Sequence, residues 1–277
     1  MEPVVPRLGV IGWPVAHSRS PAMFSAAFAA CDMWDWSYQR LPLPPELFDE
    51  ITRALGAGGF VGANVTIPYK GAALALAARA SDPARAIGAA NTLTFRADGT
   101  IEAENTDAPG VLAALGCSPA GMSALVLGAG GSARAVVWGL LNGGASRVSV
   151  WNRTPERAVV LASELGARAV SAPVEADVLV NCTSVGLQRS ASDAVALNQL
   201  GLTADQVGGY AYVVDLVYRD GLTPLLAAAR RHRVATVDGL EVLVAQGALS
   251  FELWTGRPAP LDAMRHGAGI EHAERSP

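Results

Sequence analysis

A glycine-rich turn between an apolar run and a helical pattern restricts the fold of this 277-residue chain more than any other segment. Residues 124–133 read ALVLGAGGSA, the spacing GxGxxG with alanine in the last position. In such turns the first glycine permits a tight turn, the second lets the backbone approach a pyrophosphate, and the N–H groups that open the helix favour phosphate. We therefore predict a dinucleotide site here, the alternative being a tight turn that binds no ligand. Its residues are Gly128, Ala129, Gly130, Gly131 and Ser132.

Apolar runs of strand length alternate with helical patterns over most of the chain, which is typical of an α/β fold with mostly parallel sheets covered on both faces. The expected strands are 7–11, 37–41, 59–67, 90–96, 100–103, 124–127, 147–151, 178–181 and 213–216. The expected helices are 20–31, 44–55, 72–80, 132–142, 155–165 and 240–256. Residues 188–209 show little periodicity and are expected to form a long loop. Ser20, immediately before Pro21, is expected to be the N-cap of its helix.

The end of the strand that follows the glycine turn distinguishes between the two nicotinamide dinucleotides. An NAD site places a carboxylate there, about 20 residues on, to bind the ribose 2′-hydroxyl. The sequence instead has Asn152, Arg153 and Thr154, with Arg157 one turn later. The guanidinium of Arg153 can pair with a 2′-phosphate, which a carboxylate would repel. These residues favour NADP over NAD, unless Arg153 and Arg157 form only a solvated surface.

Composition argues against several other classes of protein. Hydrophobic residues make up 51% of the chain and charged residues 17%, which predicts a packed core rather than disorder. A net charge of −4 and the lack of a Lys/Arg run argue against a nucleic-acid partner. The three cysteines and four histidines show no metal-ligand spacing, and neither a leader peptide nor an 18-residue apolar stretch is recognisable. We expect a cytoplasmic protein, monomeric or homodimeric, with no metal and no membrane partner.

Polar side chains recur inside apolar segments of the first half of the chain. They are Ser18, Ser20, Asn64, Thr66, Lys70, Asn91, Thr92, Asn105, Thr106 and Asp107. Thr66 and Lys70 lie where an expected strand ends and a helix begins, which places a hydroxyl and an ammonium close together. Considered alone, Lys70 could be a solvated surface residue, and Asp107 could be the N-cap of the helix that follows Pro109.

At these residues the sequence resembles the shikimate dehydrogenases, and the resemblance covers almost the whole chain. The matching segments are HSRSP at 17–21, NVTIPYK at 64–70, IGAANTL at 87–93, NTDAPG at 105–110, GAGGSARA at 128–135, NRT at 152–154, NCTSVG at 181–186, DLVY at 215–218 and DGLEVLVAQGALSFELWTG at 238–256. One such segment could arise by chance, but nine in the family's order leave little room for coincidence. The chain departs from the family at Phe24-Ser25, where His-Asn is frequent, at Glu241, where glycine is common, and at residues 219–221.

The resemblance implies reversible, NADP-dependent reduction of 3-dehydroshikimate to shikimate, an oxidoreductase reaction at a CH–OH group in aromatic amino-acid (chorismate) biosynthesis. It also implies a substrate-binding domain of residues 1–105 and 238–277, a Rossmann-type NADP-binding domain of residues 106–237, and a cleft between them. One alternative is a quinate/shikimate or aminoshikimate dehydrogenase that uses NAD. A second is a non-catalytic dinucleotide sensor, against which the retention of Lys70 and Asp107 argues.

The family's catalytic pair corresponds to Lys70 and Asp107. Lys70 can stabilise the negative charge that develops on a carbonyl oxygen during hydride transfer and can move a proton, while Asp107 can orient it. The substrate contacts that the resemblance implies are Ser18, Ser20, Thr66, Lys70, Asn91, Asp107, Tyr218 and Gln246. The cofactor contacts that it implies, besides the glycine turn, are Asp82, Asn152, Arg153, Thr154, Arg157, Leu216 and Gly239.

Overall fold

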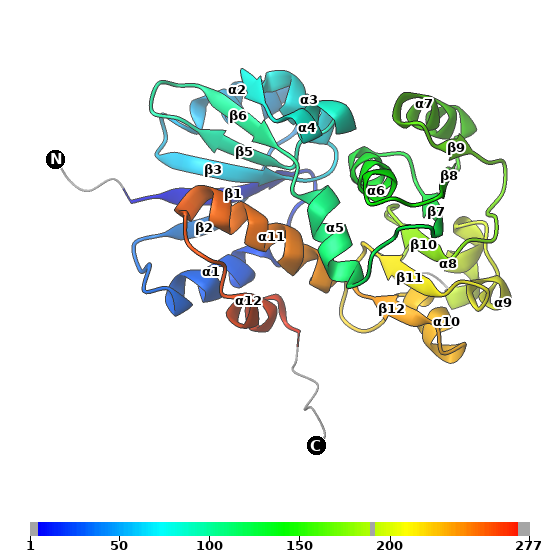
Figure 1. Cartoon of the computed structure of the whole chain (residues 1–277). Coiled ribbons are helices and arrows are strands. Elements are labelled where there is room, and N and C mark those ends of the chain that lie inside the picture. Colours follow the sequence, from blue (N-terminus) through cyan, green and yellow to red (C-terminus); the bar gives the residue numbers. More distant parts are fainter. Residues whose placement is uncertain (1–4, 189–191, 271–277) are drawn as a thin grey trace. The chain divides into compact units, whose positions relative to one another are not determined.

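The computed structural model describes residues 5–188 and 192–270, which Figure 1 shows with their helices and strands labelled. The chain divides into two compact units, which we call unit 1 (Met1–Gly110 and Leu243–Pro277) and unit 2 (Val111–Val242). The divisions lie a few residues after the predicted domain boundaries, because they fall within two helices, α5 (Asp107–Leu115) and α11 (Gly239–Thr255). Each unit contains its own six-stranded sheet, and the predicted α/β class is confirmed.

The sheet of unit 1 is mixed rather than wholly parallel. In spatial order its strands are β2 (Ser37–Pro42), β1 (Arg7–Gly12), β3 (Phe60–Val65), β5 (Thr92–Phe95), β6 (Ile101–Glu104) and β4 (Arg79–Ala80). Strand β1 is parallel to both neighbours, whereas β5 is antiparallel to β3 and to β6. The antiparallel pair follows from the short turn at 97–99, in which Gly99 has a φ of +82°, since parallel neighbours need a longer crossover.

Helices cover both faces of this sheet (Figure 1). One face carries α1 (Ser20–Ala30), α11 and α12 (Leu261–Ala268), and the other carries α2 (Phe48–Ala54), α3 (Lys70–Leu76) and α4 (Asp82–Ile87), with a short 3₁₀ helix, η1 (Pro45–Leu47), before α2. Phe24 of α1, at one of the departures from the family pattern, is fully buried and stacks on Tyr38 of β2 with ring centroids 4.2 Å apart. This departure therefore fills the core of unit 1.

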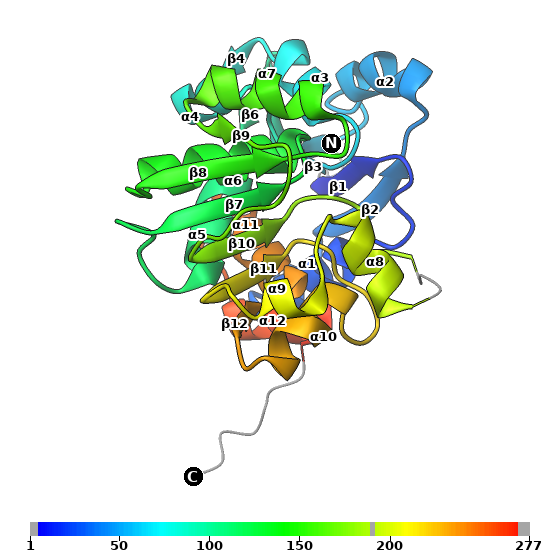
Figure 2. The ribbon, with the colours of Figure 1, turned by 90° about the vertical axis from the view of Figure 1, so that its right-hand side faces the viewer.

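The sheet of unit 2 is parallel throughout. Its order is β12 (Ala235–Val237), β11 (Tyr212–Asp215), β10 (Val178–Asn181), β7 (Ser123–Leu127), β8 (Arg147–Trp151) and β9 (Arg168–Ala169). Figure 2 shows α6 (Gly131–Asn142) and α7 (Pro155–Leu165) on one face and α8 (Asp193–Gln199), α9 (Ala204–Val207) and α10 (Pro224–Arg231) on the other. Because both faces are covered, the central strands β7 and β10 are almost continuously apolar.

Three local predictions were wrong. The helix expected at 72–80 ends at Leu76, and residues 79–80 form strand β4. The segment 188–209, expected to be a loop, contains α8 and α9; residues 189–191 lie outside the described part. Both helices are short and depend on caps rather than on a long apolar period: the Ser192 hydroxyl accepts from the Val195 N–H, and Thr203 forms a capping box with Gln206. Ser20 is the first residue of α1 and not its N-cap, a position that Arg19 occupies without a side-chain hydrogen bond. None of the described helices is long and apolar enough to cross a bilayer.

Close packing of β3 against α11 generates a stability prediction. A Cβ atom on Gly62 would lie 2.2 Å from Trp254 Nε1 and 2.8 Å from the Leu93 carbonyl oxygen. We expect Gly62→Ala to lower the free energy of unfolding by about 2–3 kcal/mol, the usual cost of overpacking. The control is Gly71→Ala in α3, where a Cβ meets nothing within 4 Å. Urea unfolding followed by tryptophan fluorescence measures both, and equal midpoints for the two variants would contradict this packing.

Candidate active site

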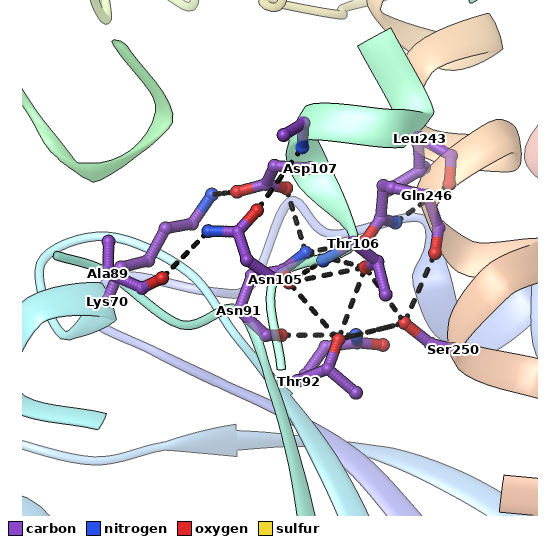
Figure 3. Close-up of polar contacts among 12 residues, drawn as sticks. Lys70, Ala89, Asn91, Thr92, Asn105, Thr106, Asp107, Leu243, Gln246 and Ser250 are labelled. Atoms are coloured by element: carbon purple, nitrogen blue, oxygen red, sulfur yellow. Dashed lines mark hydrogen bonds and ion pairs between the residues drawn. The ribbon is translucent and has the colours of Figure 1, made fainter. Parts of the chain in front are cut away.

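Lys70 opens α3 directly after the loop that follows β3, and it is the only lysine among the 277 residues, against 20 arginines. Its Nζ lies 2.5 Å from Asp107 Oδ2, and the two side chains are only 10% and 12% exposed. A carboxylate at this distance forms a short, charge-assisted hydrogen bond with the ammonium in a site from which most water is excluded. The structure therefore brings the two predicted catalytic residues into direct contact (Figure 3).

Asp107 is the first residue of α5, and neighbouring residues hold its carboxylate. Asn91 Nδ2 donates to Asp107 Oδ1 over 2.8 Å, so each carboxylate oxygen has a donor. The capping function considered for Asp107 falls instead to Asn105, whose Oδ1 accepts from the Ala108 N–H over 3.2 Å. The Asp107 carboxylate is thus available to orient Lys70 rather than to satisfy the helix terminus.

Asn91 is the centre of a buried polar network in unit 1 (Figure 3). Its Nδ2 lies 3.2 Å from Gln246 Oε1, and its Oδ1 accepts from the Thr106 N–H over 2.7 Å. The hydroxyls that complete the network belong to Thr92, Thr106 and Ser250, and the carboxamide of Asn64 donates to two of them. A network whose members satisfy one another in a low dielectric fixes side-chain positions, so Asn91 has little freedom to rotate.

The predicted substrate hydroxyls lie on two loops that follow parallel strands of unit 1. Ser18 and Ser20, after β1, are 5% and 4% exposed, and the Ser20 N–H donates to Ser18 Oγ over 3.3 Å. Thr66 follows β3, and its N–H donates to the Ile11 carbonyl at the end of β1 over 2.9 Å. The two loops therefore share the end of the sheet from which Lys70 also projects.

The glycine turn of unit 2 has the geometry that its spacing predicts. Gly128 has a φ of +108°, and a Cβ there would lie 3.1 Å from the backbone of Cys182, so only glycine suits the position. A Cβ on Gly130 would meet nothing within 4 Å, which shows open space in front of the N-terminus of α6. Ala133 is fully buried against the sheet. These residues fit a pyrophosphate at the helix terminus, where N–H groups have no intrahelical partner.

The segment after β8 carries two exposed arginines. Arg153 and Arg157 are exposed, and within residues 5–188 and 192–270 no acidic side chain pairs with either. Asn152 Nδ2 donates to the Thr154 carbonyl over 2.8 Å and so tightens the loop that leads to α7. The donor set fits a phosphate monoester better than a ribose hydroxyl, because guanidinium groups match its charge and planar geometry.

The remaining predicted contacts are distributed over both units. Leu216 and Tyr218 follow β11 and are half-buried, and a Cβ on Gly239 would lie 2.7 Å from the Leu216 carbonyl oxygen, so the backbone at 239 packs directly on that segment. Asp82 lies at the exposed first turn of α4 in unit 1, where its carboxylate pairs with Arg85 over 2.5 Å. In the part of the chain that is described, no cluster of His, Cys, Asp and Glu side chains could hold a metal ion.

A buried carboxyl that the sequence did not single out supports the loops after β10 and β11. Asp215 is fully buried, accepts from Asn181 Nδ2 over 2.8 Å and from the Val217 N–H over 3.1 Å, and contacts the Thr223 hydroxyl over 2.6 Å. Burial raises the pKa of Asp215 to about 7; the three hydrogen bonds oppose this rise, and the charge of Asp238 adds to it. The carboxyl thus joins three segments at one end of the unit 2 sheet.

Comparison with known proteins identifies the family. Residues 10–93 match the family model described as the shikimate dehydrogenase substrate binding domain, residues 114–242 match shikimate / quinate 5-dehydrogenase, and residues 239–266 match the shikimate 5'-dehydrogenase C-terminal domain. A shikimate dehydrogenase (NADP(+)) of Methylobacterium radiotolerans is 46% identical over 275 residues, which cover 94% of each chain. The chain belongs to the shikimate dehydrogenase family. The resemblance at the nine segments is thus confirmed.

Solved structures of the shikimate dehydrogenase family and its structural relatives share this fold. Shikimate 5-dehydrogenase from Thermus thermophilus, in complex with NADP(H) and shikimate, is 40% identical and superimposes with a TM-score of 0.83, covering 95% of this chain and 98% of that one. A 5-ketofructose reductase of a Gluconobacter species is 28% identical, with a TM-score of 0.81 and coverage of 95% and 97%. The same architecture therefore carries both names, and the side chains of the site, not the fold, determine the substrate.

The ionisation of Asp215 generates a pH prediction. Because the folded state holds this proton more tightly than the unfolded chain, whose carboxyl has the ordinary pKa of 3.8, stability falls as the pH rises from about 4 to about 7. In Asp215→Asn the amide keeps one acceptor for Asn181 and donates to Thr223, and it does not ionise. We expect the variant to gain about 1–4 kcal/mol in free energy of unfolding relative to wild type between pH 4.5 and pH 8. Parallel urea titrations across this range measure the difference, and a constant difference would show that Asp215 ionises as it does in water.

Proposed function

We propose that this protein catalyses the reversible, NADP-dependent reduction of 3-dehydroshikimate to shikimate. The observation that carries the proposal is the buried contact between Lys70 and Asp107, held by Asn91, in a chain of the shikimate dehydrogenase family. In this proposal unit 1 binds the substrate, unit 2 binds NADP, and the reaction takes place in the cytoplasm as a step of aromatic amino-acid biosynthesis.

The proposed chemistry divides between cofactor and protein. NADP, when bound, supplies or accepts the hydride. During reduction, Lys70 Nζ donates a hydrogen bond to the carbonyl oxygen, which stabilises the negative charge that develops there, and then provides the proton that the new hydroxyl needs. During oxidation the same nitrogen accepts the hydroxyl proton. Asp107 keeps the ammonium in position and accepts a hydrogen bond from a neighbouring substrate hydroxyl.

Lysine suits this role in a way that arginine does not. An ammonium can lose its proton when its surroundings change, whereas a guanidinium stays protonated in proteins. The chain uses arginine at 20 positions and lysine at Lys70 alone. This single exception, located in a buried pair with a carboxylate, supports proton transfer as the function of the residue.

Hydroxyl and amide groups on unit 1 suit the polar substrate. Ser18 and Ser20 are proposed to bind its carboxylate, and Thr66, Asn91 and Gln246 its hydroxyls, with Tyr218 as a further contact. A site made of hydrogen-bonding groups discriminates strongly against analogues that lack the matching hydroxyl, because its buried polar groups are then left unpaired.

NADP is proposed over NAD because Arg153, Arg157 and Thr154 stand where a carboxylate would otherwise bind the ribose hydroxyl. The alternative is an enzyme that prefers quinate, or aminoshikimate, with NAD. Steady-state rates with shikimate and NADP, compared with quinate and NAD, distinguish these proposals by following the absorbance of the reduced nicotinamide. A higher kcat/KM for quinate with NAD would overturn our choice, and no turnover of any of them would favour a dinucleotide sensor.

Replacement of Lys70 tests the proposed acid and base. We expect Lys70→Ala to lower kcat for shikimate oxidation by at least about 100-fold, since general acid–base catalysis is typically worth about 10²–10⁴-fold. The affinity for NADP, measured by fluorescence titration, should stay within about twofold, because every proposed dinucleotide contact except Asp82 lies on unit 2. Turnover at the wild-type rate would remove Lys70 from the mechanism.

Replacement of Arg153 tests the choice of cofactor. We expect Arg153→Gln to raise the KM for NADP by about tenfold, the value of one charge-assisted contact with a phosphate, and to leave the KM for NAD unchanged. The matched control is Arg168→Gln, an exposed arginine at the edge strand β9 of the same unit. If the KM values for both dinucleotides rise together, Arg153 contributes to the loop structure and not to recognition of the 2′-phosphate.

A further inference from the structure

One arginine of unit 1 has no role in the proposed mechanism or in the family motifs. It lies against the segment His17–Ser20 after β1, which we call the serine loop. Arg40, on β2, donates from Nε and Nη2 to the carbonyl oxygen of Ser18, over 3.1 Å and 2.6 Å. Only two of its five N–H donors are required for this contact. Within residues 5–188 and 192–270 no carboxylate pairs with it. A full positive charge is therefore held beside Ser18 with donors to spare.

The position of Arg40 follows from the pleat of β2. Side chains two residues apart lie on the same face of a strand, so Arg40 lies on the face of Tyr38. The Tyr38 ring stacks on Phe24 of α1, which places this face of β2 against α1. The register pairs Arg40 with Val10, near the end of β1 from which the chain leaves towards Ser18. The fold thus directs Arg40 towards the start of α1.

Other features of the same loop also point to an anion. Ser20 is only 4% exposed, and its hydroxyl forms no hydrogen bond with any of the described residues. It is the first residue of α1, an 11-residue helix whose N-terminus carries a partial positive charge. Both features match an acceptor group with negative charge, supplied from outside the chain.

The neighbouring basic residues do not supply this charge. Arg19 directs its guanidinium elsewhere, since its Nη1 donates over 3.1 Å to the Ala268 carbonyl at the end of α12. Partial burial and the charge of Arg40 lower the pKa of His17, so this imidazole contributes less positive charge to the loop. Arg40 is therefore a cation that two hydrogen bonds hold against the serine loop.

We propose that Arg40 is the residue that makes unit 1 select substrates with a carboxylate, by holding the Ser18 carbonyl and by placing a positive charge beside the hydroxyls of Ser18 and Ser20. The inference rests on the proposed function, because the carboxylate belongs to the proposed substrate. Arg40 acts on binding and not on the reacting carbon, where Lys70 and Asp107 act. It is thus a specificity-determining residue.

The expected size of the effect follows from the exposure of Arg40. Solvent screens an exposed cation, so its attraction for a nearby carboxylate changes an affinity by about tenfold. We expect Arg40→Gln to raise the KM for shikimate by about tenfold with kcat within about twofold. Arg40→Lys, which keeps the charge, should recover most of the affinity. Arg7→Gln is the matched control, because Arg7 is an exposed arginine at the opposite end of β1, where it lies beside Gly58.

The decisive comparison uses the methyl ester of shikimate, which has no negative charge. If Arg40 acts on the carboxylate, kcat/KM for shikimate falls about tenfold in Arg40→Gln, while kcat/KM for the ester stays within about twofold of wild type. If Arg40 only maintains the loop, both substrates lose the same factor, and the proposal is overturned. Equal values for wild type and Arg40→Gln with shikimate overturn it as well.

Calorimetric titration of shikimate into wild type and Arg40→Gln separates this inference from the proposed function. Binding that depends on Arg40 without turnover by wild type would refute the proposed reaction and support the carboxylate site. Turnover by wild type with binding independent of Arg40 would refute only the carboxylate site. If shikimate binds to neither protein, both proposals fail.

Discussion

The buried contact between Lys70 and Asp107 is the interaction around which the polar site of unit 1 is arranged. Removing two charges from water costs several kcal/mol per ion, and their attraction offsets this only where further hydrogen bonds fix the geometry. Asn91 supplies the bond to the second carboxylate oxygen, and Gln246 and Thr106 in turn hold Asn91. Such a pair contributes little to stability on balance. The polar network is therefore better understood as the means by which a reactive ammonium is kept in one place.

Both units place their polar groups after the carboxyl ends of parallel strands, the general location of ligand sites in open α/β sheets. In unit 1 the loops after β1 and β3 carry the serine pair and Lys70. In unit 2 the loop after β7 carries the glycine turn, and Arg153 and Arg157 lie on the loop after β8 and in the first turn of α7. Asp215 hydrogen-bonds to the end of β10 and to the loop after β11. Strand pairing thus collects residues that are far apart in the sequence at one edge of each sheet.

The sequence was sufficient to predict local structure where a short segment determines its own conformation. The strand, glycine turn and helix at 124–142 were predictable because Gly128 needs a positive φ and the flanking periods are clear. Helices α8 and α9 were missed because segments of seven and four residues are too short to show an apolar period. The bond between Thr92 and Ser250, 158 residues apart, and the burial of Asp215 could not be predicted, since both depend on tertiary packing. The positions of Lys70 and Asp107 were predictable from family motifs, whereas their contact required the fold.

Single-turnover oxidation of shikimate by Lys70→Arg, with NADP in excess, tests the central claim most directly. Arginine keeps the positive charge and can still pair with Asp107, but it does not release its proton. If Lys70 moves a proton, the variant remains folded, binds NADP as wild type does, and forms reduced cofactor at least about 100-fold more slowly. Formation of reduced cofactor at close to the wild-type rate would show that the charge alone suffices and would contradict the account.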